Sequence, residues 1–216
     1  MRAKLLVTLA ISTAAASLWA APASAAENLY WDGGFGQKAE RRSDVVLGAS
    51  TGLLLGMSHA YPNEVEKIDD PFYEVDTGFG AGYNYGFWIG GALKDWFVFG
   101  LGGMGLSLGG SDANASGGGA LLHVETFPLY GLGGGYRDLA IYADFGAGSL
   151  DLDSDIKEDA SGGFISIVGL GGAYELWRLG SFAIGPNANY QYMWSTTSSS
   201  HFATLGFRAV FYGGPG

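Results

Sequence analysis

Two of the three histidines in the chain lie next to serines, a combination that can supply a base and a nucleophile. His59 follows Ser58, and His201 follows a run of three serines at 198–200. Nucleophilic catalysis also needs a third group that orients the base, and all three must converge within hydrogen-bond reach. No motif in the sequence enforces that convergence. The absence of cysteine excludes cysteine nucleophiles, thiolate metal sites and disulfide scaffolds.

The segment 151–162 begins like a calcium-binding loop, with carboxylates at its first, third and fifth positions. The match fails at the sixth position, which is Ile156 instead of glycine, and at the twelfth, which is Gly162 instead of glutamate. We therefore expect a solvated acidic loop and no metal site, and we interpret the acidic segment 64–74 in the same way. The acidic residues concerned are Glu64, Glu66, Asp69, Asp70, Asp151, Asp153, Asp155, Glu158 and Asp159.

The composition indicates a folded chain with an unusual backbone. The 216 residues include 38 glycines, and 48% of them are hydrophobic against 15% charged, which is too apolar for a disordered protein. The formal net charge is −10, with only 11 lysines and arginines. Because nucleic-acid binding requires clustered basic residues, we expect neither DNA nor RNA as a partner.

The amino terminus has the pattern of a secretory signal peptide. Arg2 and Lys4 precede an apolar stretch that ends in Ala23-Ser24-Ala25, a sequence suited to signal peptidase. We expect cleavage after residue 25, which leaves a mature chain of 191 residues that works outside the cytoplasm. No later stretch reaches the roughly 18 apolar residues of a transmembrane helix, so a membrane-embedded form would have to use strands.

Long segments of the mature chain alternate between apolar and small or polar residues. In 182–194, aromatic and aliphatic side chains alternate with Ala, Gly, Asn and Gln, and 77–89 and 203–212 behave alike. Alternation with period two indicates β-strands. These runs have about 12 residues, whereas strands of soluble sheets usually have 5 or 6 and tilted membrane strands need about 9 to 11. The length therefore favours a membrane barrel.

The sequence predicts an all-β fold, an eight-stranded antiparallel up-and-down transmembrane β-barrel over residues 44–212. Short connections at 94–95, 131–136 and 180–181 would be periplasmic turns, and longer ones at 59–75, 109–117, 151–161 and 196–200 would be extracellular loops. Residues 26–43 would form a periplasmic lead, either flexible or acting as a plug, and 213–216 a short tail. The expected strands are 44–58, 76–93, 96–108, 118–130, 137–150, 162–179, 182–195 and 201–212.

The chain resembles the small outer-membrane β-barrel proteins of Gram-negative bacteria, grouped as the outer membrane protein beta-barrel domain. The segments that carry the resemblance are 45–52, 88–93, 169–176, 182–190 and the closing strand 201–212. It implies residence in the outer membrane as a monomer, contact with its lipid and lipopolysaccharide, and insertion by the barrel assembly machinery. Divalent ions could bridge the acidic loops to lipopolysaccharide phosphates.

For function, this resemblance first suggests a non-catalytic barrel that supports envelope integrity, or surface interaction through its acidic loops. Two alternatives stay open. One is a narrow channel for small or hydrophobic solutes, and the other is a lipid A-modifying enzyme with the histidines at its outer rim. No cofactor is expected.

Five ionisable residues are predicted to face the barrel lumen: His123, Glu125, Asp144, Glu175 and Arg208. Glu175 and Arg208 each lie four residues before the periplasmic end of their strands, so we expect a charge-assisted pair between them. Our hypothesis is that Glu125, Asp144 and Glu175 surround Arg208. Such a network either fills and stabilises the lumen or forms a gated proton or ion path, and an eight-stranded barrel is just wide enough to be filled by side chains.

Overall fold

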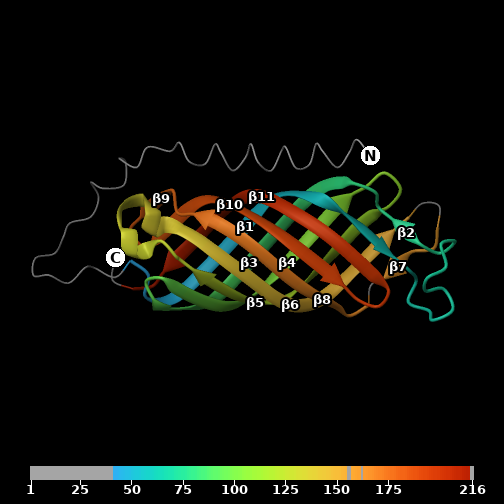
Figure 1. Ribbon diagram of the computed structural model, residues 1–216, viewed down its shortest axis with the longest axis horizontal. Coiled ribbons are helices and arrows are strands. Elements are labelled where there is room, and N and C mark those ends of the chain that lie inside the picture. The colour runs from blue at the N-terminus through green and yellow to red at the C-terminus, as the bar shows by residue number, and fades with distance from the viewer. Residues whose placement is uncertain (1–40, 155–156, 162, 215–216) are drawn as a thin grey trace, which may run out of the picture. The chain divides into compact units, whose positions relative to one another are not determined.

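The computed structural model describes residues 41–154, 157–161 and 163–214. The predicted signal peptide, most of the predicted lead, Asp155 and the last two residues of the tail lie outside these ranges. The described chain forms a closed antiparallel β-barrel (Figure 1), as the sequence predicts. Its long strands are β1 (Asp44–Ala60), β3 (Gly80–Lys94), β4 (Phe97–Gly109), β5 (Asn114–Thr126), β6 (Leu139–Asp153), β8 (Ile165–Tyr174), β10 (Phe182–Trp194) and β11 (Ser198–Tyr212).

The barrel closes because β1 pairs with β11 as well as with β3. A row of paired residues that starts at Leu205 and runs through β1, β3, β4 and β5 reaches β6 at Asp151. The same row followed the other way, through β10 and β8, reaches β6 at Ile141. The two positions reached on β6 differ by ten residues. A stagger of this size requires the strands to tilt strongly relative to the barrel axis.

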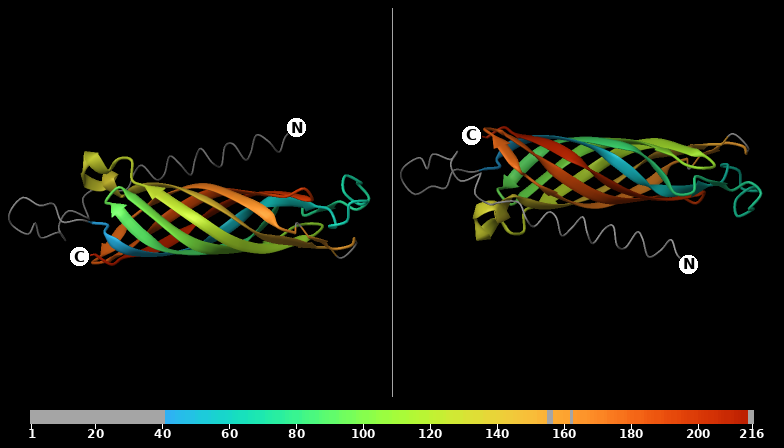
Figure 2. Two further views of the ribbon diagram at one scale, coloured as in Figure 1. Left: turned by 90° about the horizontal axis from the view of Figure 1, so that it is seen from below. Right: turned by 90° about the horizontal axis from the view of Figure 1, so that it is seen from above.

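The connections define two ends of the barrel, which we call the turn end and the loop end. Figure 2 shows the end of β11, in red, at the turn end and the longest loop, 61–79, at the other. The connection 127–138 at the turn end is longer than the predicted turn 131–136 and holds two short 3-10 helices, η2 (Tyr130–Leu132) and η3 (Gly134–Asp138). At the loop end 110–113 and 195–197 are shorter than predicted, because β5 and β11 begin earlier.

Two further short strands extend the barrel wall at the loop end. β2 (Val75–Asp76) pairs with the end of β1, and β7 (Ala160–Ser161) pairs with the end of β6. They belong to the loops 61–79 and 154–164, so part of each loop is fixed to the barrel by backbone hydrogen bonds.

A β-bulge interrupts the strand predicted at 162–179, dividing it into β8 and β9 (Trp177–Leu179). Ala173 pairs with Asn187 and Trp177 with Ile184, so three residues of one strand face two of the other. Pro186 lies within this gap and has no N–H to donate, which is compatible with a break in the ladder. Because of the extra residue, the side chains of β9 face the opposite sides of the wall from those that strict alternation along β8 would give.

The outer wall of the barrel is an apolar belt. Leu101 is 66% exposed, and many other large apolar side chains on the same face are similarly uncovered. Soluble proteins rarely expose so continuous an apolar surface, whereas outer-membrane barrels carry such a band against lipid. The chain is therefore an outer-membrane barrel protein. Other members of the belt are Leu47, Leu53, Tyr83, Phe87, Ile89, Phe145, Leu170, Leu205 and Phe207. No helix in the described part of the chain has the length and apolarity needed to span a bilayer.

The lumen differs between its two halves. In the half near the loop end, inward side chains pack as an apolar core; they include Leu54, Leu108, Leu150, Ile165, Met193 and Phe202. In the half near the turn end, aromatic and aliphatic residues are interleaved with charged ones. Gly48 makes room there for Trp88, because a Cβ at position 48 would lie 2.0 Å from the indole ring. The charged residues of this half form the candidate site.

Candidate functional site in the barrel lumen

Four of the predicted inward residues meet near the middle of the lumen, and we call them the lumen cluster: His123, Glu125, Asp144 and Arg208. The imidazole Nδ1 of His123 lies 2.7 Å from Asp144 Oδ1, and its Nε2 lies 3.5 Å from Glu125 Oε2. Arg208 Nη2 lies 2.5 Å from Glu125 Oε1. This last contact is close but lacks hydrogen-bond alignment, so we describe it as an ion pair.

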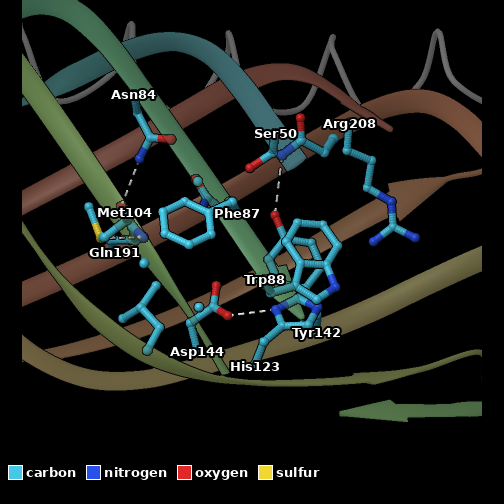
Figure 3. Close-up of a pocket in the computed structure, with 16 residues that line it drawn as sticks. Ser50, Asn84, Phe87, Trp88, Met104, His123, Tyr142, Asp144, Gln191 and Arg208 are labelled. Carbon is cyan, nitrogen blue, oxygen red and sulfur yellow. Dashed lines mark hydrogen bonds and ion pairs between the residues drawn. The ribbon is translucent and has the colours of Figure 1, made fainter. Parts of the chain in front are cut away.

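Aromatic rings hold the imidazole of His123 in place. Trp88 of β3 stacks on it with ring centroids 4.5 Å apart, and Tyr142 of β6 packs beside it at 5.3 Å. Figure 3 shows these rings around the bond between His123 and Asp144. The histidine is thus fixed by one hydrogen bond and two rings, which leaves it little rotational freedom.

A small cavity adjoins the lumen cluster on the side of the loop end. Its volume is about 40 Å³, enough for about two to four water molecules at roughly 10–15 Å³ each. Asn84 Nδ2 donates to Gln191 Oε1 at 3.2 Å across this space, and Gln191 also donates to the sulfur of Met104 at 3.3 Å (Figure 3). The cavity is therefore bounded by an amide pair and is much smaller than a typical ligand pocket.

A second ionic group, the turn-end cluster, closes the opposite side of the lumen. It consists of Arg41, Arg42, Asp138, Glu175 and Arg178. Arg42 is at its centre, with Nη2 lying 2.5 Å from Glu175 Oε2 and 3.2 Å from Asp138 Oδ1. Its guanidinium also lies 3.4 Å above the ring of Phe127. Arg42 is 1% exposed, so the side chain two residues before the start of β1 is inserted into the barrel.

The backbone at Arg41 and Arg42 is anchored to the turn between β3 and β4. Both backbone N–H groups donate to Asp95 Oδ1, at 2.7 and 2.8 Å. Tyr130 donates to the other oxygen of Asp95 at 2.6 Å, and Arg178 donates to the carbonyl of Arg41 at 2.9 Å. These bonds fix the chain across the mouth of the barrel, so Arg42 is held in place by its backbone as well as its side chain.

Electrostatics favour the charged form of Arg42 despite its burial. Burial by itself lowers the pKa of this guanidinium, but the Glu175 carboxylate and then Asp138 outweigh it, and the pKa is raised. Burial raises the pKa of Asp138. The positive charges of Arg41 and Arg42 lower it and so offset part of this rise. Arg208 Nη2 lies 3.7 Å from Glu175 Oε1, so the turn-end cluster and the lumen cluster form one chain of charges.

All five residues predicted to face the lumen are buried there, and the structure brings them into one chain of contacts. The expected pair of Glu175 and Arg208 is a distant contact of 3.7 Å, because the nearer partner of Arg208 is Glu125 and that of Glu175 is Arg42. Counting residues from the strand ends ignored the bulge at 174–176.

Sequence reasoning did not place the other members of the turn-end cluster. Arg41 and Arg42 lie in the predicted lead, for which both a flexible and a plugging role were open. Arg178 and Asp138 fall within the strands predicted at 162–179 and 137–150, and neither is among the residues predicted to face the lumen. For Arg41 and Arg42 the signal is an adjacent pair of arginines one residue ahead of the first strand, in a chain poor in basic residues.

The histidines and serines at the loop end lie on different faces of the barrel wall. Ser58 and Ser200 face the lumen, with their hydroxyls 2.6 Å apart. His201 faces outward and shares a hydrogen bond of 2.6 Å with the Tyr190 hydroxyl. His59 lies across from Ser199 on the outer face, but within the described ranges neither histidine is hydrogen-bonded to a serine of this group. The arrangement expected of a nucleophile and its base is not formed.

The acidic residues of the loop end are exposed. Asp151 and Asp153 belong to the end of β6 and not to the loop predicted at 151–161. Among the described residues, no group of three or more acidic or histidine side chains has the arrangement of a metal site. The exposed residues are Glu64, Glu66, Asp69, Asp70, Asp151, Asp153, Glu158 and Asp159.

Comparisons with known proteins find similar barrels only among solved structures. No protein-family model matches the chain, and no curated protein matches it. It is similar to Ail, the attachment invasion locus protein of Yersinia pestis, with 14% identity, a TM-score of 0.49, and coverage of 78% of this chain and 99% of Ail. Neisserial surface protein A has 10% identity and a TM-score of 0.44, with 77% and 96% covered. The N-terminal β-barrel domain of Pseudomonas aeruginosa OprF has 17% identity and a TM-score of 0.42, with 79% and 99% covered.

Proposed function

We propose that the protein is a non-catalytic outer-membrane barrel with a closed lumen, which serves envelope integrity and presents an acidic surface outside the cell. The observation that carries this proposal is the filling of the lumen from both ends. Arg42 and its partners close the turn end, and the apolar core closes the loop half. Between them remains a cavity of about 40 Å³.

The two longer loops are tied together, which supports a defined outer surface. Lys67 Nζ lies 3.1 Å from Glu64 Oε1 within the first loop and 2.7 Å from Glu158 Oε2 in the loop 154–164. Hydrogen bonds to Glu158 and Glu64 raise the pKa of Lys67, so the ammonium stays charged. Lys157 in turn donates to the backbone carbonyl of Glu74. The remaining carboxylates face solvent and attract cationic partners.

The geometry favours this function over the two alternatives. A channel for small or hydrophobic solutes would need a continuous path, and the described side chains fill the lumen. A lipid A-modifying enzyme would need a nucleophile beside its base, whereas Ser58 and His201 lie on opposite faces of the wall. Contacts with lipopolysaccharide, insertion by the barrel assembly machinery and a monomeric state remain part of the proposal.

Solute permeation tests the closed lumen. We expect proteoliposomes that contain the folded protein to swell in arabinose no faster than protein-free liposomes, because no path through the barrel admits the sugar. Light scattering measures the swelling, and the heat-dependent shift of the barrel on SDS gels verifies folding. Swelling that increases in proportion to the amount of folded protein would support the channel and exclude the closed barrel.

A further inference from the structure

An open groove lies on the rim of the barrel at the loop end, away from the lumen. Its volume is about 400 Å³, within the range of roughly 300–1,000 Å³ that is usual for ligand sites. It lies where the ends of β8 and β10 meet the first loop, since Ser166 pairs with Trp194 across these strands. The residues of interest are Asn63, Phe164, Ser166, Trp194, Ser195 and Thr196.

Two aromatic rings line the groove and are open to a ligand. Trp194 is stacked on Tyr192, with centroids 5.1 Å apart and planes inclined by 11°, so the orientation of the indole is fixed. Phe164 is 83% exposed, although burial of such a ring is favourable. An oriented indole and an uncovered phenyl ring provide flat apolar surfaces on which a ring-shaped ligand can stack.

The polar groups of the groove are uncharged, and several are free to bind. The hydroxyl of Ser195 lies 3.1 Å from those of Thr197 and Ser198, which fixes the short loop 195–197. The side chains of Asn63, Ser166 and Thr196 have no hydrogen-bond partner within the described part of the chain. Amide and hydroxyl groups both donate and accept, so they suit a ligand whose own groups are hydroxyls.

We propose that this groove binds a neutral saccharide. Sugars combine apolar faces of C–H groups, which stack on aromatic rings, with hydroxyls that need donors and acceptors together. A sulfated or phosphorylated sugar is disfavoured, because the lining carries no cation and Glu64 directly follows Asn63 in the acidic loop. The groove adjoins the aromatic residues of the membrane belt, so the sugar could belong to a glycolipid or to a free glycan. The proposal does not depend on the state of the lumen.

Saturation-transfer NMR on the full mature protein in lipid nanodiscs tests the proposal. The probes are maltotriose and N,N′,N″-triacetylchitotriose as neutral sugars and sucrose octasulfate as an anionic one. We expect transfer to the ring protons of a neutral probe and none to the sulfated one. Binding should weaken about tenfold in Trp194→Ala, as for an aromatic anchor at the centre of a site. Phe164→Ala, which removes an exposed ring and leaves the fold intact, should weaken it as well.

Trp177→Ala is the matched control, because this tryptophan lies at the turn end and is 54% exposed. It should bind the neutral probe like the wild type. A second arm uses nanodiscs that contain a lipid with a galactose headgroup. If this lipid displaces the free sugar, the groove binds the headgroup of a glycolipid. If the free sugar binds as well as before, the groove binds a free glycan. Absence of transfer in both arms would overturn the proposal. Transfer in Trp194→Ala and in Phe164→Ala as strong as in the wild type would overturn it too.

Discussion

The variant Arg42→Ala should have a free energy of unfolding about 3 kcal/mol below that of the wild type, near the lower end of the range for breaking a buried ion pair. The substitution leaves the carboxylates of Glu175 and Asp138 in the barrel without their central cation. The loss of stability is not larger because each carboxylate keeps another arginine nearby. Arg178 lies 3.7 Å from Glu175, and Arg41 lies 3.2 Å from Asp138.

Urea-induced unfolding in phospholipid vesicles, followed by tryptophan fluorescence, measures this difference. Arg137→Ala is the matched control, since Arg137 precedes Asp138 but makes no ion pair among the described residues. Only its backbone carbonyl accepts a bond from Arg42, and the substitution preserves that carbonyl. We expect the control to change stability by less than about 1 kcal/mol. Equal stability of Arg42→Ala and the wild type would show that Arg42 does not hold the turn end closed.

The variant Arg208→Met should lose about 3–5 kcal/mol of stability, because it leaves Glu125 buried with a single weak partner. Glu125 is 0% exposed, and after the substitution its nearest remaining partner is the imidazole of His123, 3.5 Å away. Replacing both residues, as Arg208→Met with Glu125→Leu, should recover most of the loss. An apolar pair of similar volume avoids burying any uncompensated charge.

A double-mutant cycle measures this coupling from the same unfolding curves. The cycle consists of the wild type, Arg208→Met, Glu125→Leu and the double variant. We expect a coupling energy of at least about 2 kcal/mol, since the two side chains are in direct contact. Additive losses in the two single variants would contradict the ion pair and, with it, the lumen cluster.

The fold could be predicted because its main determinant is local. Alternation with period two assigns each residue to one face, and a membrane barrel needs that pattern over every strand. The residues that it predicts to face the lumen are buried: His123, Glu125, Asp144, Glu175 and Arg208. The turns were less predictable, because a strand end depends on pairing with its neighbour. Asn114 belongs to a strand through its partner Gly109, which local composition does not show.

The contacts within the lumen could not be predicted, because they depend on how the strands are staggered. A stagger of ten residues decides that Arg208 meets Glu125. The bulge after Ala173 also reverses the faces of the residues in β9, which brings Arg178 inward. Arg42 lies outside the alternating pattern altogether. Its place is fixed by tertiary bonds to Asp95 and Glu175, and no local periodicity encodes these.

Ion conductance across a planar lipid bilayer tests the closed lumen most directly. The folded wild-type protein is inserted and recorded in concentrated potassium chloride, beside Arg42→Ala. We predict no stable conductance steps for the wild type, because both halves of the lumen are filled. Arg42→Ala should also stay closed, since the apolar core of the loop half remains. Regular conductance steps from the wild type would contradict the closed barrel.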